Sequence, residues 1–303
     1  MADSADASRG PPPIVGILWM LLTGANFVAV TALVKHVGDA VPAPEAAFLR
    51  YLLGLVFLAP MLRPLFRAGL NRAAFVLYGW RGLAHALGVI CWFYAMTRIP
   101  IAEVTAMNYL NPVYVTIGAA LVFGERLALR RILAIAVAFA GVLVILRPGF
   151  REVSDGHLAM LFTALFFGAS YLMAKKLSER DNAAVVVAML SISVTIALAP
   201  FAFAVWVTPT LTQLSWLFGV AFFATAGHFT MTMAFRAAPL TVTQPVTFLQ
   251  LVWATLVGWL MFDEAVDGWV ILGGGMIVGA VVFITWREAV LRRRASAPAA
   301  TKP

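Results

Sequence analysis

The 303-residue chain is too hydrophobic to be an ordinary water-soluble domain. Hydrophobic residues make up 62% of it and charged residues 12%, with a mean hydropathy of +0.91, whereas charged residues make up about 25% of soluble domains. The net charge of +8 lies in short clusters between apolar runs, which excludes a nucleic-acid-binding surface and is typical of loops that set membrane topology. The single cysteine, Cys91, excludes a disulfide framework and a thiolate metal site.

Ten apolar runs predict an all-α integral membrane protein with ten transmembrane helices, because a spanning helix needs about 20 apolar residues. The runs are continuous, which excludes the alternating strands of a membrane β-barrel. The connections are short and hold no catalytic pair at usable spacing, so we expect neither an enzyme nor a cofactor. The runs cover residues 13–34, 42–62, 73–97, 101–123, 131–146, 157–175, 183–207, 214–235, 240–262 and 268–286.

The Lys and Arg residues of the loops predict the orientation of the chain. With ten spans, the side that holds both termini carries 16 basic residues and the opposite side carries 4, while Arg50 and Arg81 lie within spans. We therefore expect a multi-pass protein of the bacterial inner membrane. Its tails, residues 1–12 and 288–303, are expected to be cytoplasmic.

The two halves of the chain are similar to each other, which predicts a duplicated five-helix unit. The motif Met-Leu-Leu-Thr at 20–23 returns as Met-Leu-Phe-Thr at 160–163, and other pairs are separated by 139 residues. Because five is odd, the second copy must cross the membrane upside down, as in the inverted repeats of secondary transporters. We expect repeats at 14–147 and 156–287. The pairs separated by 139 are Gly88 and Gly227, Pro100 and Pro239, and Glu125 and Glu264.

Short motifs in both halves resemble EamA-type exporters of the drug/metabolite transporter superfamily. They are Pro-Glu-Ala-Ala-Phe-Leu-Arg at 44–50, Leu-Asn-Pro-Val at 110–113 before Gly-Glu at 124–125, and Leu-Gln-Leu-Val at 249–252 before Asp-Glu at 263–264. The resemblance implies a substrate cavity between the halves and alternating access. Members of this superfamily move amino acids, other metabolites, nucleotide sugars or drugs.

Two polar stripes occupy equivalent spans and are expected to face each other across the repeat axis. In each stripe the spacing i, i+3, i+6 keeps the side chains within an arc of about 120°. Such groups can bind helices together at about 0.6–2 kcal/mol each, or they can line a solute pathway. For both stripes together we favour the pathway. The stripes are Thr105, Asn108 and Asn111 in the first half, and Gln244, Thr247 and Gln250 in the second.

Prolines accompany both stripes, but at unequal positions. Pro112 follows Asn111, whereas the second half has Leu251 after Gln250 and a proline at Pro245. Each proline removes one backbone hydrogen bond and frees a carbonyl. We expect hinges at Pro112 and Pro245 or, alternatively, ordinary packing kinks.

The third run carries a second polar face made of Tyr78, Arg81, His85 and Trp92. Arg81 can reach cytoplasmic headgroups or bind a substrate carboxylate. His85 has no acid at ligand spacing, and neither does His228, so we expect no metal site. Hydrogen-bonded histidines are the default, with proton coupling as the alternative.

Two acids and four small residues complete the candidates at helix ends and helix contacts. Glu125 and Glu264 end equivalent helices on opposite membrane faces, which indicates gates or structural pins. The small pairs permit close helix packing and form a scaffold or a homodimer interface. These pairs are Ala136 with Ala140 and Gly275 with Gly279.

The sequence thus predicts a transporter that binds one small organic solute between its repeats. Aromatic and amide groups with little buried charge suit neutral or zwitterionic solutes, and we expect export of bulky apolar or aromatic amino acids. The alternatives are an importer or exchanger of a nucleotide-like or phosphorylated metabolite, and a water-filled channel. Proton coupling and facilitated diffusion both remain open. Further expected lining residues are Asn26, Tyr94, Tyr109, Tyr171, Phe223 and Phe248.

Overall fold

The computed structural model describes residues 13–123, 128–238 and 240–296. All regular elements of these residues are helices, so the all-α expectation is confirmed. In chain order they are α1 (Pro13–Val37), η1 (Gly38–Ala40), α2 (Ala43–Gly54), η2 (Leu55–Met61), α3 (Leu62–Arg67), α4 (Arg72–Met96), α5 (Ile101–Asn108), α6 (Asn111–Phe123), α7 (Leu129–Leu146), α8 (Asp155–Ser178), α9 (Ala183–Ala204), α10 (Leu211–Ala237), α11 (Leu240–Thr247), α12 (Leu249–Phe262) and α13 (Gly268–Ser296).

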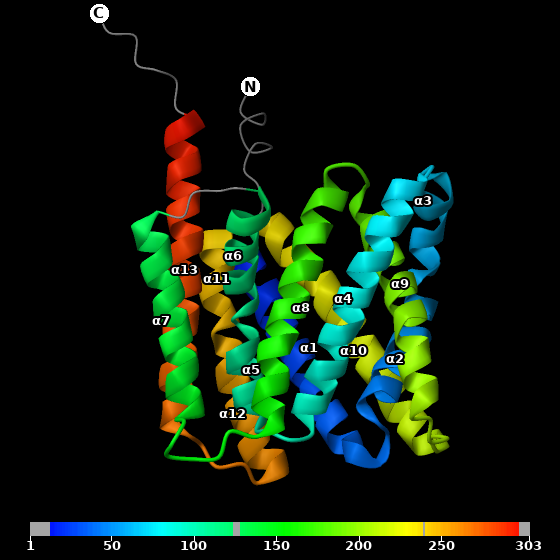
Figure 1. The fold of residues 1–303 in the computed structure, drawn as a ribbon, viewed down its shortest axis with the longest axis horizontal. Coiled ribbons are helices and arrows are strands. Elements are labelled where there is room, and N and C mark those ends of the chain that lie inside the picture. Colours follow the sequence, from blue (N-terminus) through cyan, green and yellow to red (C-terminus); the bar gives the residue numbers. More distant parts are fainter. Residues whose placement is uncertain (1–12, 124–127, 239, 297–303) are drawn as a thin grey trace, which may run out of the picture.

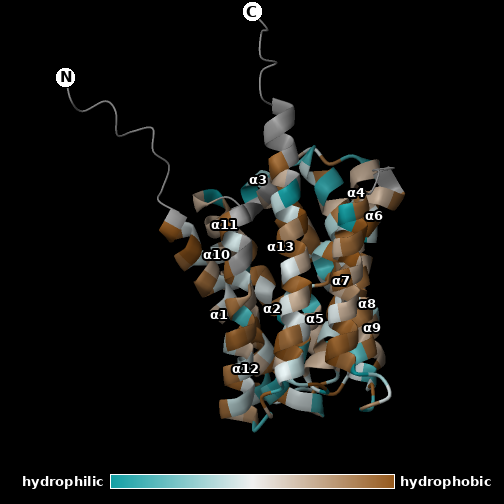
Figure 2. Cartoon of the chain, turned by 90° about the vertical axis from the view of Figure 1, so that its left-hand side faces the viewer, coloured by the Kyte–Doolittle hydropathy of each residue, from teal (hydrophilic) through white to brown (hydrophobic). Residues whose placement is uncertain are grey.

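Among the described residues, 7 helices are long and apolar enough to cross a membrane, namely α1, α4, α7, α8, α9, α10 and α13. Figure 1 shows them side by side in one bundle. Figure 2 shows hydrophobic residues along most of the helix lengths and hydrophilic residues mainly at the two ends. We call the end where α13 finishes the upper end, and the end with the α7–α8 connection the lower end, as in Figure 1.

Each of the three remaining expected spans is built from shorter helices. The run at 42–62 consists of α2, η2 and the first residue of α3. The run at 101–123 divides into α5 and α6 at Tyr109 and Leu110, and the run at 240–262 divides into α11 and α12 at Phe248. A broken helix at membrane depth leaves backbone groups that must find partners inside the protein.

Side chains cap the helices that begin at loops, because the first N–H groups of a helix have no partner within it. Asn71 Oδ1 accepts a hydrogen bond from Ala74 N at 2.9 Å at the start of α4, and Asn182 Oδ1 accepts one from Val185 N at 3.0 Å at the start of α9. Thr210 and Gln213 form a reciprocal capping box at the start of α10. These polar residues fix where the apolar helices begin.

Two long helix pairs pack in equivalent ways in the centre of the bundle. In the pair α4 and α8, Gly88 leaves room for the ring of Phe167, since a Cβ there would lie 2.6 Å from the ring. In the pair α1 and α10, Gly227 faces Phe27, whose ring would lie 3.3 Å from a Cβ. Gly88 and Gly227 are separated by 139 residues, and Phe27 and Phe167 by 140. The pairing of a glycine with an aromatic ring therefore recurs in both halves.

Helices α7 and α13 approach most closely at Gly141 and Gly273. A Cβ on Gly141 would lie 2.6 Å from the carbonyl oxygen of Gly273, and a Cβ on Gly273 would clash with the carbonyl oxygen of Gly141. Such backbone contact is typical of small residues in membrane helices. It does not involve the four residues expected for this role: Gly279 has open space around its Cβ position, Gly275 meets only the Phe248 ring, Ala136 is exposed and Ala140 is half-buried.

The substitution Gly273→Ala is expected to destabilise the protein by about 1–3 kcal/mol, because the added methyl group overpacks the contact with α7. The matched control Gly279→Ala, in the same helix but with open space, should be neutral or stabilising by about 0.5–1 kcal/mol. Thermal unfolding of the detergent-solubilised variants measures the difference. Equal unfolding temperatures for the two variants would contradict this description of the contact.

Candidate functional site

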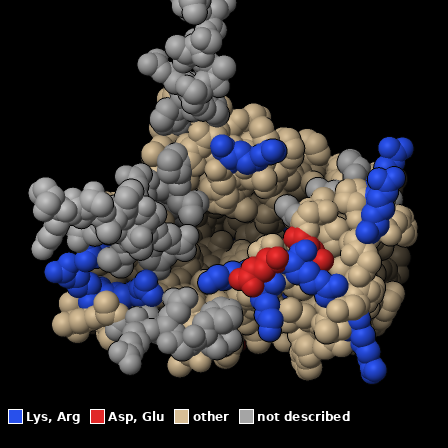
Figure 3. Space-filling view, turned by 90° about the horizontal axis from the view of Figure 1, so that it is seen from above, with Lys and Arg blue, Asp and Glu red and all other residues tan. Residues whose placement is uncertain are grey.

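A hollow opens in the middle of the upper face, among the Lys and Arg residues that surround it (Figure 3). Tyr171 of α8 is 42% exposed and His228 of α10 is also exposed, yet both have interior neighbours. Tyr171 lies beside Phe167 and within electrostatic range of Tyr51 and Arg81. Since these neighbours belong to the inside of the bundle, the exposure of Tyr171 is to an internal space. We call this space the central hollow.

His85 of α4 joins three helices next to the central hollow. Its Nε2 lies 2.9 Å from the hydroxyl of Tyr51 in α2, and its Nδ1 lies 3.2 Å from Ser170 Oγ in α8. The ring of Phe167 stacks on it at 4.7 Å between centroids. His85 is thus a hydrogen-bonded interior histidine, and the residues described contain no group of acids, cysteines and histidines that could hold a metal ion.

The other members of the α4 polar face have different neighbours. Arg81 is 5% exposed and donates a hydrogen bond from Nη1 to the carbonyl of Val186 in α9 at 3.0 Å. The hydroxyl of Tyr78 donates to Asp181 Oδ2 at 2.8 Å in the α8–α9 connection. These two contacts hold α4 to α9 and to the α8–α9 connection, toward the upper end of the bundle. Trp92 is half-buried, and its ring lies 6.1 Å from that of Phe167.

The remaining expected lining residues are not all gathered in one place. Asn26 is buried and donates to the carbonyl of Leu22 at 2.7 Å within its own helix, α1. The Tyr94 ring lies under the guanidinium of Arg98 at 3.6 Å, in the lower part of the bundle. Phe223 is half-buried beside Phe222 in α10. Phe223 is also packed against the hydrophobic core.

The polar stripe of the first half is largely packed inside the protein. Thr105 is 3% exposed and Asn111 is 8% exposed, while Asn108 is half-buried. Asn111 Nδ2 donates to Asn108 Oδ1 at 2.9 Å, which bridges the break between α5 and α6. Thr105 Oγ1 and Asn111 Oδ1 are buried and accept no hydrogen bond from the described residues. In this half the stripe joins two helix segments.

The second stripe lies along α11 and α12. Gln250 is half-buried against Gly24 of α1, where a Cβ would lie 3.4 Å from the Gln250 Cβ. Thr247 is also half-buried. The side chains of Gln244 and Pro245 lie outside the described residues, as does Glu125.

The two helix breaks are connected by one hydrogen bond. The hydroxyl of Tyr109, at the first break, donates to the backbone carbonyl of Thr247, at the second, over 2.7 Å. That carbonyl is available because Leu251 N bonds to Phe248 O at 3.0 Å, three residues back, rather than to Thr247. Pro112 is the second residue of α6, directly after the first break. The breaks therefore face each other, and a side chain of the first satisfies a backbone carbonyl of the second.

The lower end is closed by charged groups from both halves of the chain. Lys35 Nζ at the end of α1 lies 2.5 Å from Glu264 Oε1, and it also donates to the carbonyl of Ile99 at 2.9 Å. Glu264 Oε2 accepts from Ile101 N, the first residue of α5, at 2.9 Å. The two charged side chains are 17% and 12% exposed. Glu264 thus connects the end of α12 to the end of α1 and the start of α5, and Lys35 is the partner that the sequence did not suggest.

A second group of charges joins the α7–α8 connection to α5 and α8. Arg151 binds both carboxylate oxygens of Glu103 at 2.8 Å, and His157 Nε2 lies 2.5 Å from Glu103 Oε2. The hydrogen bonds to Glu103 raise the pKa of Arg151 above its ordinary value, so this arginine stays charged. Arg147 also pairs with Asp267. The ion pairs Arg151–Glu103 and Arg147–Asp267 each connect segments of the lower end that are distant in sequence.

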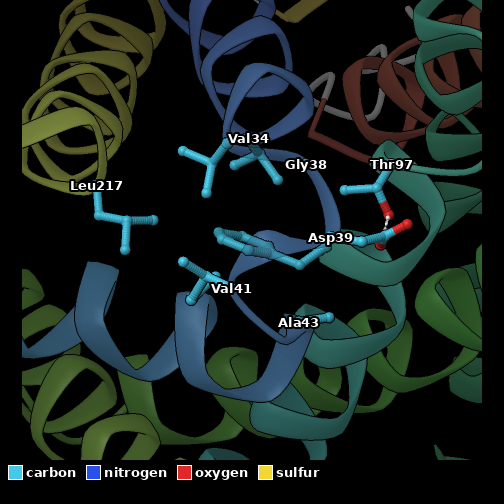
Figure 4. Close-up of a pocket in the computed structure, with 10 residues that line it drawn as sticks. Val34, Gly38, Asp39, Val41, Ala43, Thr97 and Leu217 are labelled. Carbon is cyan, nitrogen blue, oxygen red and sulfur yellow. Dashed lines mark hydrogen bonds between the residues drawn. The ribbon is translucent and has the colours of Figure 1, made fainter. Parts of the chain in front are cut away.

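A small, largely apolar pocket lies at the lower end, away from the central hollow. Figure 4 shows Val34, Val41 and Leu217 around it, with Thr97 donating a hydrogen bond to Asp39 Oδ1 at 3.0 Å. It has no convergent set of polar groups of the kind that orients a ligand. We therefore assign this pocket to the packing of the closed end.

Arg50 of α2 is a further interior residue to which the sequence analysis gave no role. It lies six residues after Pro44 within a run, Glu45–Tyr51, in which every residue is buried. A charged residue in the middle of a membrane span is by itself a signal of function, and that signal could have identified it.

Comparisons with known proteins agree with this architecture. The EamA-like transporter family matches the chain over residues 14–147 and again over 154–286. A riboflavin transporter of Rhizobium johnstonii is 30% identical over 288 residues, which cover 93% of this chain and 94% of the relative. A solved crystal structure has a similar fold with a TM-score of 0.59 at 20% identity, and the match covers 90% of this chain and 96% of that chain.

Other relatives are named for different solutes. A pseudopaline exporter of Pseudomonas aeruginosa is 27% identical over 274 residues, covering 89% of this chain and 95% of the relative. An S-adenosylmethionine uptake transporter of Rickettsia prowazekii is 25% identical over 280 residues, covering 90% and 93%. These relatives are membrane transporters by name, and the family matches extend over nearly the whole helical bundle. The chain is a multi-pass membrane protein that belongs to the EamA-like transporter family of the drug/metabolite transporter superfamily.

Proposed function

We propose that this protein is a secondary transporter that moves one small organic metabolite across the bacterial inner membrane by alternating access. The observation that carries the proposal is the difference between the two ends of the bundle. The central hollow opens at the upper face, while ion pairs between the two halves close the lower face. A carrier must expose its site to one side at a time, whereas an open channel needs a continuous path.

The proposal includes ten spans arranged as two inverted repeats, residues 14–147 and 156–287, with both tails in the cytoplasm. The recurring contacts support it: α4 packs on α8 through Gly88 and Phe167, as α1 packs on α10 through Gly227 and Phe27. Each of these pairs joins the third span of one half to the first span of the other. In inverted-repeat transporters the site lies where the repeats meet, near the membrane midplane. The ring contacts of Tyr171 with Phe167 and of His228 with Phe27 support a site beside these helix pairs.

The substrate class is drawn from the lining of the hollow. The relatives above are named for riboflavin, pseudopaline and S-adenosylmethionine, and none of these three names supports the expectation of amino-acid export. Aromatic rings of Tyr171, Trp92 and Phe223 suit a solute with a planar or apolar part. One of the three relatives is named as an exporter and another as an uptake transporter. The direction of transport and the coupling ion must therefore be measured in a transport assay.

Counterflow in proteoliposomes tests transport directly. Liposomes that contain the purified protein are loaded with unlabelled metabolite and exposed to trace labelled riboflavin, S-adenosylmethionine or aromatic amino acids. We expect transient accumulation of at least one labelled solute, saturating with concentration. Flux that rises linearly without saturation would identify a channel instead, and no protein-dependent flux for any metabolite in a broad panel would contradict the proposal.

Substitutions at the hollow should weaken solute binding more than they weaken the fold. Tyr171→Ala and His228→Ala are each expected to raise the half-saturating solute concentration about tenfold, since loss of a packed aromatic contact costs about 1–2 kcal/mol. The controls are Phe162→Ala and Phe229→Ala in the same helices, where the rings are 53% and 62% exposed on the outside of the bundle. Equal effects of test and control variants would exclude Tyr171 and His228 from the solute site.

The pair Lys35 and Glu264 is expected to act as the lower gate. Glu264→Gln leaves the mostly buried ammonium of Lys35 without its counter-charge, which should shift the equilibrium toward an open lower end by about 1–3 kcal/mol. The control is Asp39→Asn, which breaks a more exposed pair with Arg98.

Spin labels at Phe150 and Leu211, which are 92% and 84% exposed at the lower end, report the opening in a Cys91→Ser background. The distance between labels should lengthen or broaden in Glu264→Gln and stay unchanged in Asp39→Asn. An unchanged distance in Glu264→Gln would remove the gating role and leave Glu264 a structural residue.

A further inference from the structure

Arg50 is a buried cation to which the described residues offer no hydrogen-bond acceptor. Its side chain is 8% exposed, and no group of the described residues accepts a hydrogen bond from its guanidinium. Within the described part of the chain, its close interaction is with the neighbouring Tyr51 ring, whose centroid lies 4.0 Å from Arg50 Cζ. The face of an aromatic ring attracts the positive charge. It accepts no hydrogen bond from the five N–H groups, which lie in the plane of the guanidinium.

The surroundings of Arg50 are positive rather than negative. Its charge acts on the rings of both His85 and His228, and the charge of Arg81 also acts on His85. The nearest acid along its helix, Glu45, accepts a hydrogen bond from Val207 N at 2.8 Å instead. Of the ion pairs formed by the described residues, none includes Arg50 or Arg81. An unpaired interior cation is costly, so a resident anion is the natural partner.

The approach to Arg50 is from water and not from lipid. All residues of Glu45–Tyr51 are buried, so this part of α2 presents no face to the bilayer. His228, on which the charge of Arg50 acts, is exposed to the central hollow. The hollow opens at the upper face. An anionic group of a dissolved solute can therefore reach the guanidinium, whereas a lipid headgroup has no lateral path along this segment.

We propose that Arg50 binds the anionic group, a carboxylate or a phosphate, of the solute that enters the central hollow. The planar guanidinium offers two parallel N–H groups to such an anion, and Tyr171 and Trp92 offer rings for the rest of the molecule. This inference rests on the proposed transport function and narrows its substrate to organic anions and zwitterions. It favours the phosphorylated or carboxylated metabolites over neutral ones, and it places the anion at Arg50 rather than at Arg81, whose Nη1 is already bonded to Val186 O.

Paired probes that differ only in charge test the inference. The full-length protein in phosphatidylcholine nanodiscs is titrated with riboflavin 5′-phosphate against riboflavin, and with 3-phenylpropionate against 3-phenylpropionamide, and thermal unfolding reports binding. In the wild type, the anion of at least one pair should bind at least tenfold more tightly than its neutral partner. The pair that shows the preference identifies phosphate or carboxylate as the bound group.

Arg50→Met, which keeps the length of the side chain and removes its charge, should abolish that preference. Arg50→Lys should keep part of it, because lysine retains the charge without the bidentate geometry. Arg67→Met is the matched control, since Arg67 is exposed at the upper end and the same charge is removed. The ligand-free Arg50→Met protein should be as stable as the wild type or more stable, which a purely structural arginine would not allow.

Two results would overturn the inference: no anion preference in the wild type, or the same preference in Arg50→Met. Failure of the transport proposal is a separate observation, because counterflow measures flux and these titrations measure binding. A protein that transports a neutral metabolite without anion preference retains the proposed function and loses the role of Arg50. A protein with the preference but without flux retains the anion site and loses the transport proposal.

Discussion

Backbone groups within a bilayer must find hydrogen-bond partners inside the protein, and the centre of this structure depends on that constraint. The interrupted helices α5–α6 and α11–α12 both contact several other helices of the bundle. The carbonyl left free at Thr247 is bound by Tyr109 from the opposite break, and Asn111 bridges its own break to Asn108. The breaks of α5–α6 and α11–α12 thus meet each other between the two halves of the chain.

The two ends of the bundle differ in the chemistry that holds them. At the lower end Lys35 with Glu264 and Arg151 with Glu103 bind across elements that are distant in sequence. At the upper face, basic residues predominate around the hollow and acids are few (Figure 3). Ion pairs attract the helices of the lower end toward one another, whereas the like charges around the hollow repel one another. The same distribution of charge therefore gives the bundle one closed and one open face.

Much of the architecture could be predicted from the sequence because hydrophobic runs and loop charges are local signals. The runs at 101–123 and 240–262 both contain breaks near the expected prolines, although the second break is at Phe248, three residues after Pro245. Periodicity placed Thr105 and Asn111 on the face toward the centre, but it could not show that neighbouring helices bury them. Partners distant in sequence, such as Lys35 for Glu264, leave no signal in a single chain. A single sequence also cannot show that Arg50 has no acidic partner among the described residues.

The charge of Arg50, which forms no ion pair with the residues that the structure describes, also has an electrical consequence. A charge in the interior of a membrane protein feels part of the transmembrane voltage, which is worth about 2.3 kcal/mol per elementary charge for each 100 mV across the whole membrane. An empty centre is positive, and a centre that holds a monovalent anion is neutral at this residue. When the site is empty, the membrane voltage therefore acts on Arg50 in any rearrangement that moves it along the field. When the site holds a monovalent anion, the charge at this residue is neutralised and the voltage exerts no net force there. The membrane potential would then bias the return of the empty protein rather than the passage of its cargo.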